Sequence, residues 1–254
     1  MLKKRLIARM DIKAPNLVKT RQMEGLKKLG DPYDYAVKYD QAGIDEILYM
    51  DIVASLYGRN ALDDLVRRTV NDVFVPVCVG GGISGVEAAR ILFSAGADKI
   101  CLNTGAIRNP KLITELAEKY GSQAVTIQID AKQNGDGWEC WCDGAREATG
   151  ITASDWGAEV CDRGAGEILL TSVDQEGTQR GCDGHLIRAL ASLPIPVVAS
   201  GGVGCGQHVA EAFDDGADGV AMAHVLHYET ESLQSIRETV TAKGHEARNE
   251  LERN

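Results

Sequence analysis

Two aspartates, Asp11 and Asp130, are the side chains best suited to chemistry in this sequence. Each directly follows a short apolar run, Leu6–Met10 in one case and Val125–Ile129 in the other, so each would end a buried strand. Two carboxylates over one pocket suit general acid–base catalysis on a small substrate. The alternative is that each aspartate only caps the loop that follows it. All five histidines lie at or beyond residue 185, which disfavours a nucleophile activated by histidine.

Two glycine-rich turns are candidates for binding phosphate. Gly80-Gly81-Gly82 and Ser200-Gly201-Gly202 each follow an apolar run and come shortly before a predicted helix. Bare backbone amides at a helix N-terminus bind phosphate, although one such turn alone also serves as a tight connection. Two turns at related positions predict two phosphates at opposite ends of one long ligand. The first site would comprise Gly81, Gly82, Asn103 and Thr104, and the second Gly177, Thr178, Gly201, Gly202, Ala223 and His224.

The elements that would position these residues come from a pattern repeated four times: a glycine, two residues, then an apolar strand. The four copies are Gly43–Leu48, Gly96–Cys101, Gly164–Leu169 and Gly216–Ala221. Four further apolar runs alternate with them, at Leu6–Met10, Val75–Val79, Val125–Ile129 and Ile195–Ala199. Helical stretches at Gly85–Ala95, Pro110–Tyr120 and Gly206–Asp215 separate some of these strands. Eight strands alternating with helices in 254 residues predict an α/β fold, a single (βα)8 TIM barrel.

The two halves of the chain also match each other at an offset of about 120 residues. Asp11-Ile12-Lys13 corresponds to Asp130-Ala131-Lys132, and Gly81-Gly82-Ile83 corresponds to Gly201-Gly202-Val203. No Pro/Ser-rich linker separates the halves, so we expect one domain over residues 1–254. It would be built from homologous half-barrels of about residues 1–120 and 121–254.

Three charged residues occupy one equivalent position in the repeated pattern: Glu46, Lys99 and Glu167, with Gly219 in the fourth copy. Alternate strands contribute side chains to shared layers inside such a barrel, so these residues should form a ring near Arg5 at the N-terminal mouth. Buried charges are costly unless they are paired, and a charged ring in place of Val or Leu therefore suggests a function. The alternative is an ordinary salt-bridge cluster on the barrel floor.

Composition and charge narrow the classes of function. The formal net charge of −10 argues against wholesale binding to nucleic acid or to an anionic membrane. No apolar run is long enough for a transmembrane helix, and the basic start is too interrupted for a signal peptide. The seven scattered cysteines favour a reducing cytoplasm. Cys140-Trp141-Cys142 lacks a second cysteine pair or a nearby histidine, so we expect no metal site, and nothing in the sequence calls for a cofactor.

The chain resembles the cyclase subunit of imidazole glycerol phosphate synthase from end to end. The matching stretches are Gly30-Asp31-Pro32, Asp45-Glu46, Asp51–Ser55, Val79–Ile83, Gly121–Ala124, Ile129–Lys132, Gly164–Ser172 and Ala199–Gly202. The sister isomerase of the same pathway shares the barrel, both aspartates and both phosphate sites. It typically lacks the Gly-Ser-Gln-Ala and Ile-Asp-Ala-Lys stretches.

The resemblance implies that ammonia from a glutaminase partner attacks a bis-phosphorylated phosphoribulosyl aminoimidazole-carboxamide nucleotide. The products would be imidazole glycerol phosphate and an aminoimidazole carboxamide ribonucleotide. Asp11 and Asp130 would be the acid–base pair, and Lys19 would lie on a mobile loop that closes over the substrate. The charged ring would be a gate for ammonia, and the glutaminase would form a heterodimer with the chain through the N-terminal face, near Asp98 and Gln123.

Several positions depart from the usual family pattern. Arg9 stands where a small residue is common, Ala14-Pro15-Asn16 replaces an Asp-Gly turn, and Thr20 replaces a glycine. Glu176 replaces an Asp and His224 replaces a Ser near the second phosphate. A paralogue that delivers ammonia to nucleotide sugars therefore stays an open interpretation, although such paralogues commonly lack the first aspartate. The sister isomerase, and a non-enzymatic barrel that only supports a glutaminase, stay open as well.

Overall fold

Eight parallel strands close into a barrel in the computed structural model, which describes residues 3–21, 24–54 and 62–247. They are β1 (Arg5–Lys13), β4 (Glu46–Asp51), β5 (Val77–Gly80), β6 (Lys99–Leu102), β7 (Val125–Asn134), β10 (Glu167–Ser172), β11 (Val197–Ser200) and β12 (Gly219–Met222). Pairing of β10 with β7 and of β12 with β1 completes the circle. The predicted (βα)8 barrel is confirmed. The division into half-barrels near residue 120 stays a prediction.

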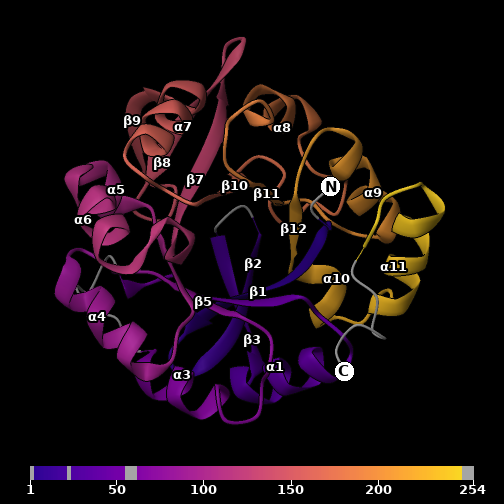
Figure 1. The fold of residues 1–254 in the computed structure, drawn as a ribbon. Helices are drawn as coiled ribbons and strands as arrows, with labels where there is room; N and C mark the ends of the chain where they lie inside the picture. The colour runs from indigo at the N-terminus through magenta and orange to yellow at the C-terminus, as the bar shows by residue number, and fades with distance from the viewer. Residues whose placement is uncertain (1–2, 22–23, 55–61, 248–254) are drawn as a thin grey trace.

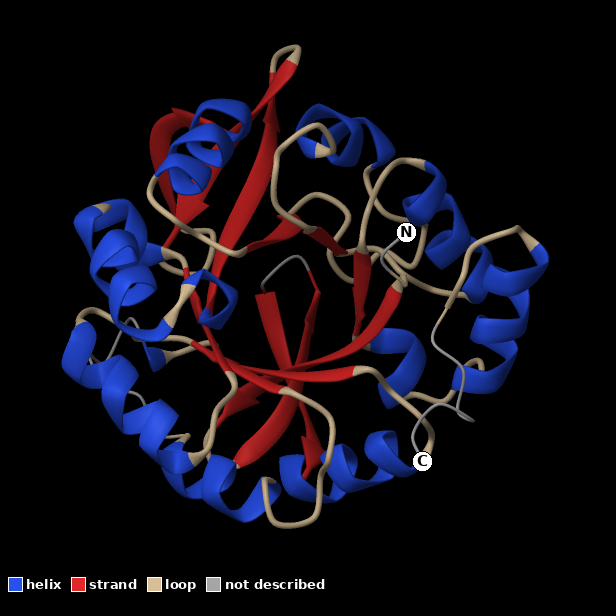
Figure 2. Cartoon of the chain, in the orientation of Figure 1, coloured by secondary structure: helices blue, strands red, loops and turns tan. Residues whose placement is uncertain are grey.

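Helices surround the strands as an outer ring (Figures 1 and 2). The helices in the described part are α1 (Pro32–Gln41), α3 (Asp63–Thr69), α4 (Val86–Ala95), α5 (Thr104–Arg108), α6 (Lys111–Tyr120), α7 (Ala153–Asp162), α8 (Gly184–Leu190), α9 (Gly206–Asp214), α10 (His224–His227) and α11 (Leu233–Ala242), with a 3₁₀ turn, η1 (Ser122–Ala124). The three helices predicted from sequence correspond to α4, α6 and α9. None of the described helices is long and apolar enough to cross a membrane.

Two predicted strands begin later than expected, and proline is the reason. The apolar runs begin at Val75 and Ile195, whereas β5 begins at Val77 and β11 at Val197. The residue just before each strand is a proline, which has no N–H to donate to the ladder. Its carbonyl is still used: Pro76 accepts from the N–H of Ile47, and Pro196 accepts from that of Ile168.

Antiparallel additions to the barrel were not predicted. β2 (Asn16–Arg21) pairs with β1 and with β3 (Glu24–Gly30), while β8 (Gly137–Cys142) pairs with β7 and with β9 (Glu147–Thr152). Both additions continue a barrel strand beyond its C-terminal end, which is the end where the site is expected. In Figure 1 the β7–β8 hairpin projects well beyond the ring of helices. Ser55, the last residue of one family motif, lies outside the described residues.

The aspartates of the repeated pattern fix the N-terminal edges of neighbouring strands. Asp45 Oδ2 accepts from the N–H of Leu6 at 2.8 Å, and Asp98 Oδ2 accepts from that of Val77 at 2.8 Å. Asp218 Oδ2 accepts from the N–H of Val197 at 3.0 Å. The fourth copy has Gly166, where a Cβ would lie 2.2 Å from the carbonyl oxygen of Ser122. The repeat is therefore a structural device that sets strand register at the barrel floor.

Candidate active site

The two predicted catalytic aspartates lie on opposite strands of the barrel. Asp11 is on β1 and Asp130 on β7, four strands apart in either direction around the closed sheet. The prediction that each aspartate ends its strand is wrong, because pairing with β2 and β8 extends β1 to Lys13 and β7 to Asn134. Both are almost completely buried, at 2% and 3% exposure. The charge of Asp11 contributes to raising the pKa of Asp130, so the two carboxylates face a common interior. The geometry therefore agrees with an opposed pair.

Asp11 is held by a buried guanidinium. Arg9 Nε donates to Asp11 Oδ1 at 3.0 Å, while Arg9 Nη1 donates to Thr171 Oγ1 at 3.0 Å and to Ser200 Oγ at 3.1 Å. Burial alone would raise the pKa of Asp11, but the charges of Arg9 and Lys19 outweigh it and lower the pKa. Asp11 is thus a carboxylate in an ion pair.

Asp130 is held by neutral amides. Gln128 Nε2 donates to Asp130 Oδ1 at 2.6 Å, and Asn103 Nδ2 donates to Asp130 Oδ2 at 2.7 Å. Burial raises the pKa of Asp130 above its usual range, and the charge of Arg9 together with the two amide hydrogen bonds only partly offsets this effect. Opposite shifts in two carboxylates of one site are the usual sign of separate acid and base roles.

A cavity of about 670 Å³ opens beside Asp130. It is lined by the whole predicted first phosphate set, Gly81, Gly82, Asn103 and Thr104, and also by Arg9 and Gln128. Gly81 has a φ of +97°, and a Cβ there would lie 2.2 Å from the carbonyl oxygen of Asp51. The close backbone approach therefore requires glycine at this position.

The second phosphate set gathers at the ends of β10, β11 and β12, outside the lining of that cavity. Gly201 and Gly202 have φ values of +95° and +94°, and the carbonyl oxygen of Gly202 accepts from the N–H of Gly181 at 2.8 Å. Gly177, also at positive φ, precedes Thr178, whose hydroxyl donates to the carbonyl of Gln175 at 2.8 Å. Ala223 is the N-cap of α10 and His224 is its first residue, and burial lowers the pKa of His224.

Lys19 lies buried on β2 at 6% exposure, and its ammonium forms an ion pair with the carboxylate of Glu176. This pair connects the β2–β3 hairpin to the loop after β10. Lys19 is close enough to influence the pKa values of Asp11 and of His224. Lys19 therefore lies near Asp11, but on strand β2 of the β2–β3 hairpin and not on a loop as predicted. The sequence did not indicate its ion pair with Glu176.

The four predicted ring residues form a closed circuit of ion pairs at the N-terminal mouth. Arg5 bridges the two carboxylates, at 3.0 Å to Glu46 and 2.5 Å to Glu167, and Lys99 bridges them again at 2.8 and 3.3 Å. Burial raises the pKa of Glu46, although Lys99 opposes that shift. The ring is present as an ion-pair cluster, and its role as a gate stays a prediction.

The two residues predicted at a partner surface are both exposed. Asp98 Oδ2 accepts from the N–H of Val77, the first residue of β5. Gln123 Nε2 donates to the carbonyl of Tyr120 at 3.4 Å. Both precede strand starts and lie on the N-terminal face. Phe74, shortly before β5, is 85% exposed and is the most exposed large hydrophobic residue in the described part.

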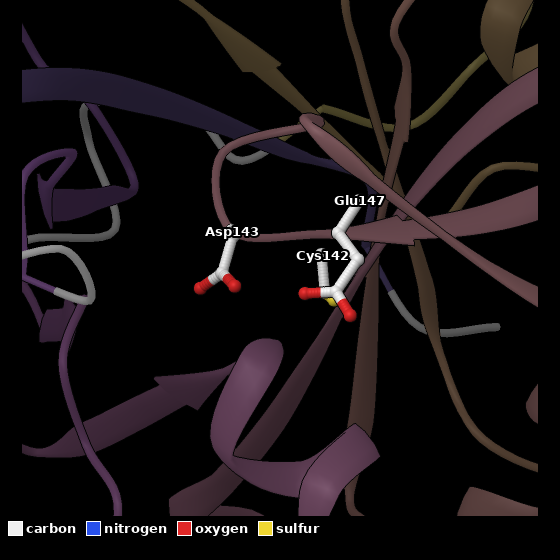
Figure 3. A group of neighbouring side chains, drawn as sticks. All are labelled: Cys142, Asp143 and Glu147. Carbon is white, nitrogen blue, oxygen red and sulfur yellow. The ribbon is translucent and has the colours of Figure 1, made fainter.

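One thiol–carboxylate group has the composition of a metal site. Cys142, Asp143 and Glu147 lie near the β8–β9 turn, with side chains close to one another (Figure 3). Arg108 forms ion pairs with both carboxylates, and burial raises the pKa of Cys142 to about 11. Because a thiol must ionise to bind metal, this arrangement favours an ion-pair cluster at the cavity rim over a metal centre.

The sequence did not lead us to the roles of two interior side chains, Arg9 and Gln128. Side chains two residues apart on a strand point to the same face. Counting back two residues from Asp11 gives Arg9, and counting back two from Asp130 gives Gln128. The signal was therefore present in the sequence once the aspartates were placed on strands.

Comparison with known proteins identifies the group to which the chain belongs. The profile of the family described as "Histidine biosynthesis protein" matches residues 5–232. A protein from Thermococcus onnurineus, named imidazole glycerol phosphate synthase subunit HisF, is 45% identical over 96% of this chain and 97% of its own length. Proteins of the same name from Legionella pneumophila and Pyrobaculum aerophilum are 51% and 45% identical, over 79% and 96% of this chain and 95% and 98% of their own lengths. With its closed barrel and paired aspartates, the chain belongs to the histidine biosynthesis protein family.

Proposed function

We propose that the chain is the cyclase subunit of an imidazole glycerol phosphate synthase in histidine biosynthesis. It is an enzyme of the lyase class that converts the phosphoribulosyl aminoimidazole-carboxamide nucleotide and ammonia to imidazole glycerol phosphate, the aminoimidazole carboxamide ribonucleotide and water. The observation that carries the proposal is the pair of buried carboxylates on opposite strands of a barrel from this family. The remaining site residues are assigned around that pair.

Asp11 and Asp130 divide the proton transfers. Attack of ammonia on the ribulosyl carbonyl forms a C–N bond and leaves an N–H proton to remove and an oxygen to protonate before water departs. Asp11, ionised beside Arg9, accepts the proton from nitrogen. Asp130, whose pKa is raised, supplies a proton to oxygen. Cleavage of the amidine C–N bond and ring closure then release the two products, with no net consumption of protons.

The two glycine turns bind the two phosphates of the substrate. Backbone N–H groups of Gly82 and Thr104 at the cavity take one phosphate, and those of Gly202 and His224 take the other. Asp11 and Asp130 would lie beneath the middle of a ligand held at both ends. Lys19 supports the closed hairpin through Glu176. No metal or cofactor takes part in this scheme.

The ring of Arg5, Glu46, Lys99 and Glu167 is the proposed entrance for ammonia. Ammonia released into solution would be protonated and diluted, so the N-terminal face must be covered by the glutaminase that produces it. The relatives are named as subunits of a synthase, which supports a partner subunit, and the proposed assembly is a heterodimer with the glutaminase. Asp98 and Gln123, exposed on that face, are proposed contacts.

The proposed location is the cytoplasm. All seven cysteines of the sequence lie in the described part, and all are free thiols. Free thiols are typical of a reducing compartment.

The test is turnover of the ribulosyl nucleotide by the isolated chain with ammonium salt at a pH of about 8.5, where more free ammonia is present. Asp11→Asn and Asp130→Asn should each lower kcat by about 10²–10⁴ without loss of folding, since each removes proton transfer but not volume. Near-normal turnover in both variants would contradict the mechanism. Conversion of the aldose isomer without ammonia would indicate the sister isomerase, and no reaction of either nucleotide would indicate sugar amidination.

A further inference from the structure

Arg9 places a full positive charge in the interior of the barrel. Its side chain is 3% exposed and donates hydrogen bonds to groups on three strands: Asp11 on β1, Thr171 on β10 and Ser200 on β11. A buried guanidinium costs several kcal/mol of desolvation unless it is paired. Because Arg9 also lines the cavity, this buried charge lies at the site and not on the barrel floor.

Gln128 occupies the corresponding place beneath the other carboxylate. Each residue lies two positions before an aspartate on a barrel strand, and each donates a hydrogen bond to that aspartate's Oδ1. The geometry is the same on both sides, but the charge differs. Asp11 accepts from a cation, Arg9, whereas Asp130 accepts from a neutral amide, Gln128.

We propose that Arg9 is a positioning residue that gives the two carboxylates different proton-transfer roles. It holds Asp11 ionised and oriented as the proton acceptor. Asp130, held by the neutral amides of Gln128 and Asn103, is left as the proton donor. The inference deepens the proposed cyclase function and rests on it.

The surroundings of Asp11 support this assignment. Arg9 and Lys19 lower the pKa of Asp11 against the effect of burial, and burial lowers the pKa of His227 to about 4, so that this imidazole stays neutral near Asp11. Arg9 Nε donates directly to the Asp11 carboxylate at 3.0 Å. Three charged or titratable groups act on Asp11: Arg9 on β1, Lys19 on β2 and His227 on α10. Asp130 on β7 and Glu176 after β10 act on Arg9, and His224 on α10 acts on His227.

The first experiment is the pH dependence of kcat/KM for the nucleotide at fixed total ammonium, expressed as the ratio of each variant to the wild type at each pH, so that the fall of free ammonia with pH cancels. The acid limb of this profile reports the proton acceptor of the free enzyme. Arg9→Met should move the acid limb upward by about one to three pH units, the usual effect of an opposite charge at this distance. Arg9→Lys should restore most of the shift, because it returns the charge. Gln128→Met, the matched control, should leave the acid limb in place even though its rate falls.

A uniform loss of rate in Arg9→Met, with no movement of the acid limb, would mean that Arg9 is merely structural and would overturn the proposal.

The second measurement does not depend on turnover: carbon NMR of the labelled Asp11 carboxylate in the wild type, Arg9→Met and Arg9→Lys. Asp11 should titrate at a higher pH only in Arg9→Met, and equal titration in all three would also overturn the proposal. If Arg9→Met fails to fold, Arg9→Gln provides the uncharged comparison in both experiments. If the nucleotide does not react while the Asp11 titration shifts as expected, the cyclase function fails and the control of Asp11 by Arg9 stands.

Discussion

Replacing Lys99 by methionine tests the charged ring directly. The substitution keeps most of the side-chain volume and removes the cation that bridges Glu46 and Glu167 at 2.8 and 3.3 Å. Arg5 is then the remaining cation of the ring for both carboxylates, and Thr126 Oγ1 still donates to Glu167 at 3.3 Å. Breaking a buried ion pair costs about 3–5 kcal/mol, and the 17% exposure of the Lys99 side chain places the expected loss near the lower end, about 3 kcal/mol. In a chain of this size that corresponds to a fall of roughly 6–12 °C in Tm.

The loss of stability in Lys99→Met should depend on pH, and the direction of that dependence follows from the pKa of Glu46. Burial raises the pKa of Glu46 in the folded state above its ordinary value of 4.5, and Lys99 lowers it. Without Lys99 the pKa rises further, so keeping the carboxylate ionised costs more stability at high pH. The cost disappears as Glu46 becomes protonated, and the deficit of the variant should therefore shrink as the pH falls toward 4.5.

Urea unfolding of the wild type and of Lys99→Met at pH of about 8 and about 5 measures this difference. The matched control is Lys111→Met, an exposed lysine at the start of α6, for which we expect a change within about 0.5 kcal/mol. A loss of stability that is equal at both pH values, or no larger than that of the control, would refute the reasoning.

In the complex, Lys99→Met should also lower turnover from glutamine while turnover from ammonium salt is largely kept. Equal loss from both nitrogen sources would mean that the ring is only structural.

Three further predictions concern the phosphate turn, a buried histidine and the exposed face. Gly81→Ala should weaken nucleotide binding and destabilise the fold by about 1–3 kcal/mol. Gly137→Ala, where a Cβ meets nothing within 4 Å, should do neither, and isothermal titration and urea unfolding measure both effects. His227 has a pKa lowered from 6.5 to about 4, so between those pH values the folded state should lose about 3 kcal/mol through this group. His227→Gln should therefore show a weaker fall in Tm with acid, and an unchanged slope would contradict the assignment. Phe74→Asp, which changes a residue 85% exposed, should weaken association with the glutaminase in sedimentation while ammonium-dependent turnover persists.

The barrel was predictable because its signals are local and repeated. The glycines of the repeat end a helix at positive φ, as Gly43 and Gly96 do, and the apolar residues that follow them enter the barrel wall. Strand starts were less predictable, since they depend on which backbone groups can pair, and Pro76 and Pro196 shifted two of them. The hairpins β2–β3 and β8–β9 were not predicted because their strands are partly exposed and lack a continuous apolar run, and their pairing is set by the barrel strand that they extend.

The site was predictable where it depends on the ends of strands. Asp11, Asp130 and Asn103 follow from strand position, and the structure brings the last two into direct contact. Contacts between distant segments could not be predicted in the same way. Nothing in the local sequence pairs Lys19 with Glu176, 157 residues apart, because the pairing depends on where the β2–β3 hairpin folds over the barrel.

Alternate residues of β1 connect the floor of the barrel to the site. Arg5 belongs to the charged ring, Ile7 to the apolar layer above it, Arg9 to the cavity lining, and Asp11 to the acid–base pair. A strand places every second side chain on one face, so these four residues are stacked at fixed spacing. A one-residue slip of β1 would remove all four from the interior together. The register of β1 against β4, fixed in part by the bond from the N–H of Leu6 to Asp45, is therefore a requirement of the chemistry as well as of the fold.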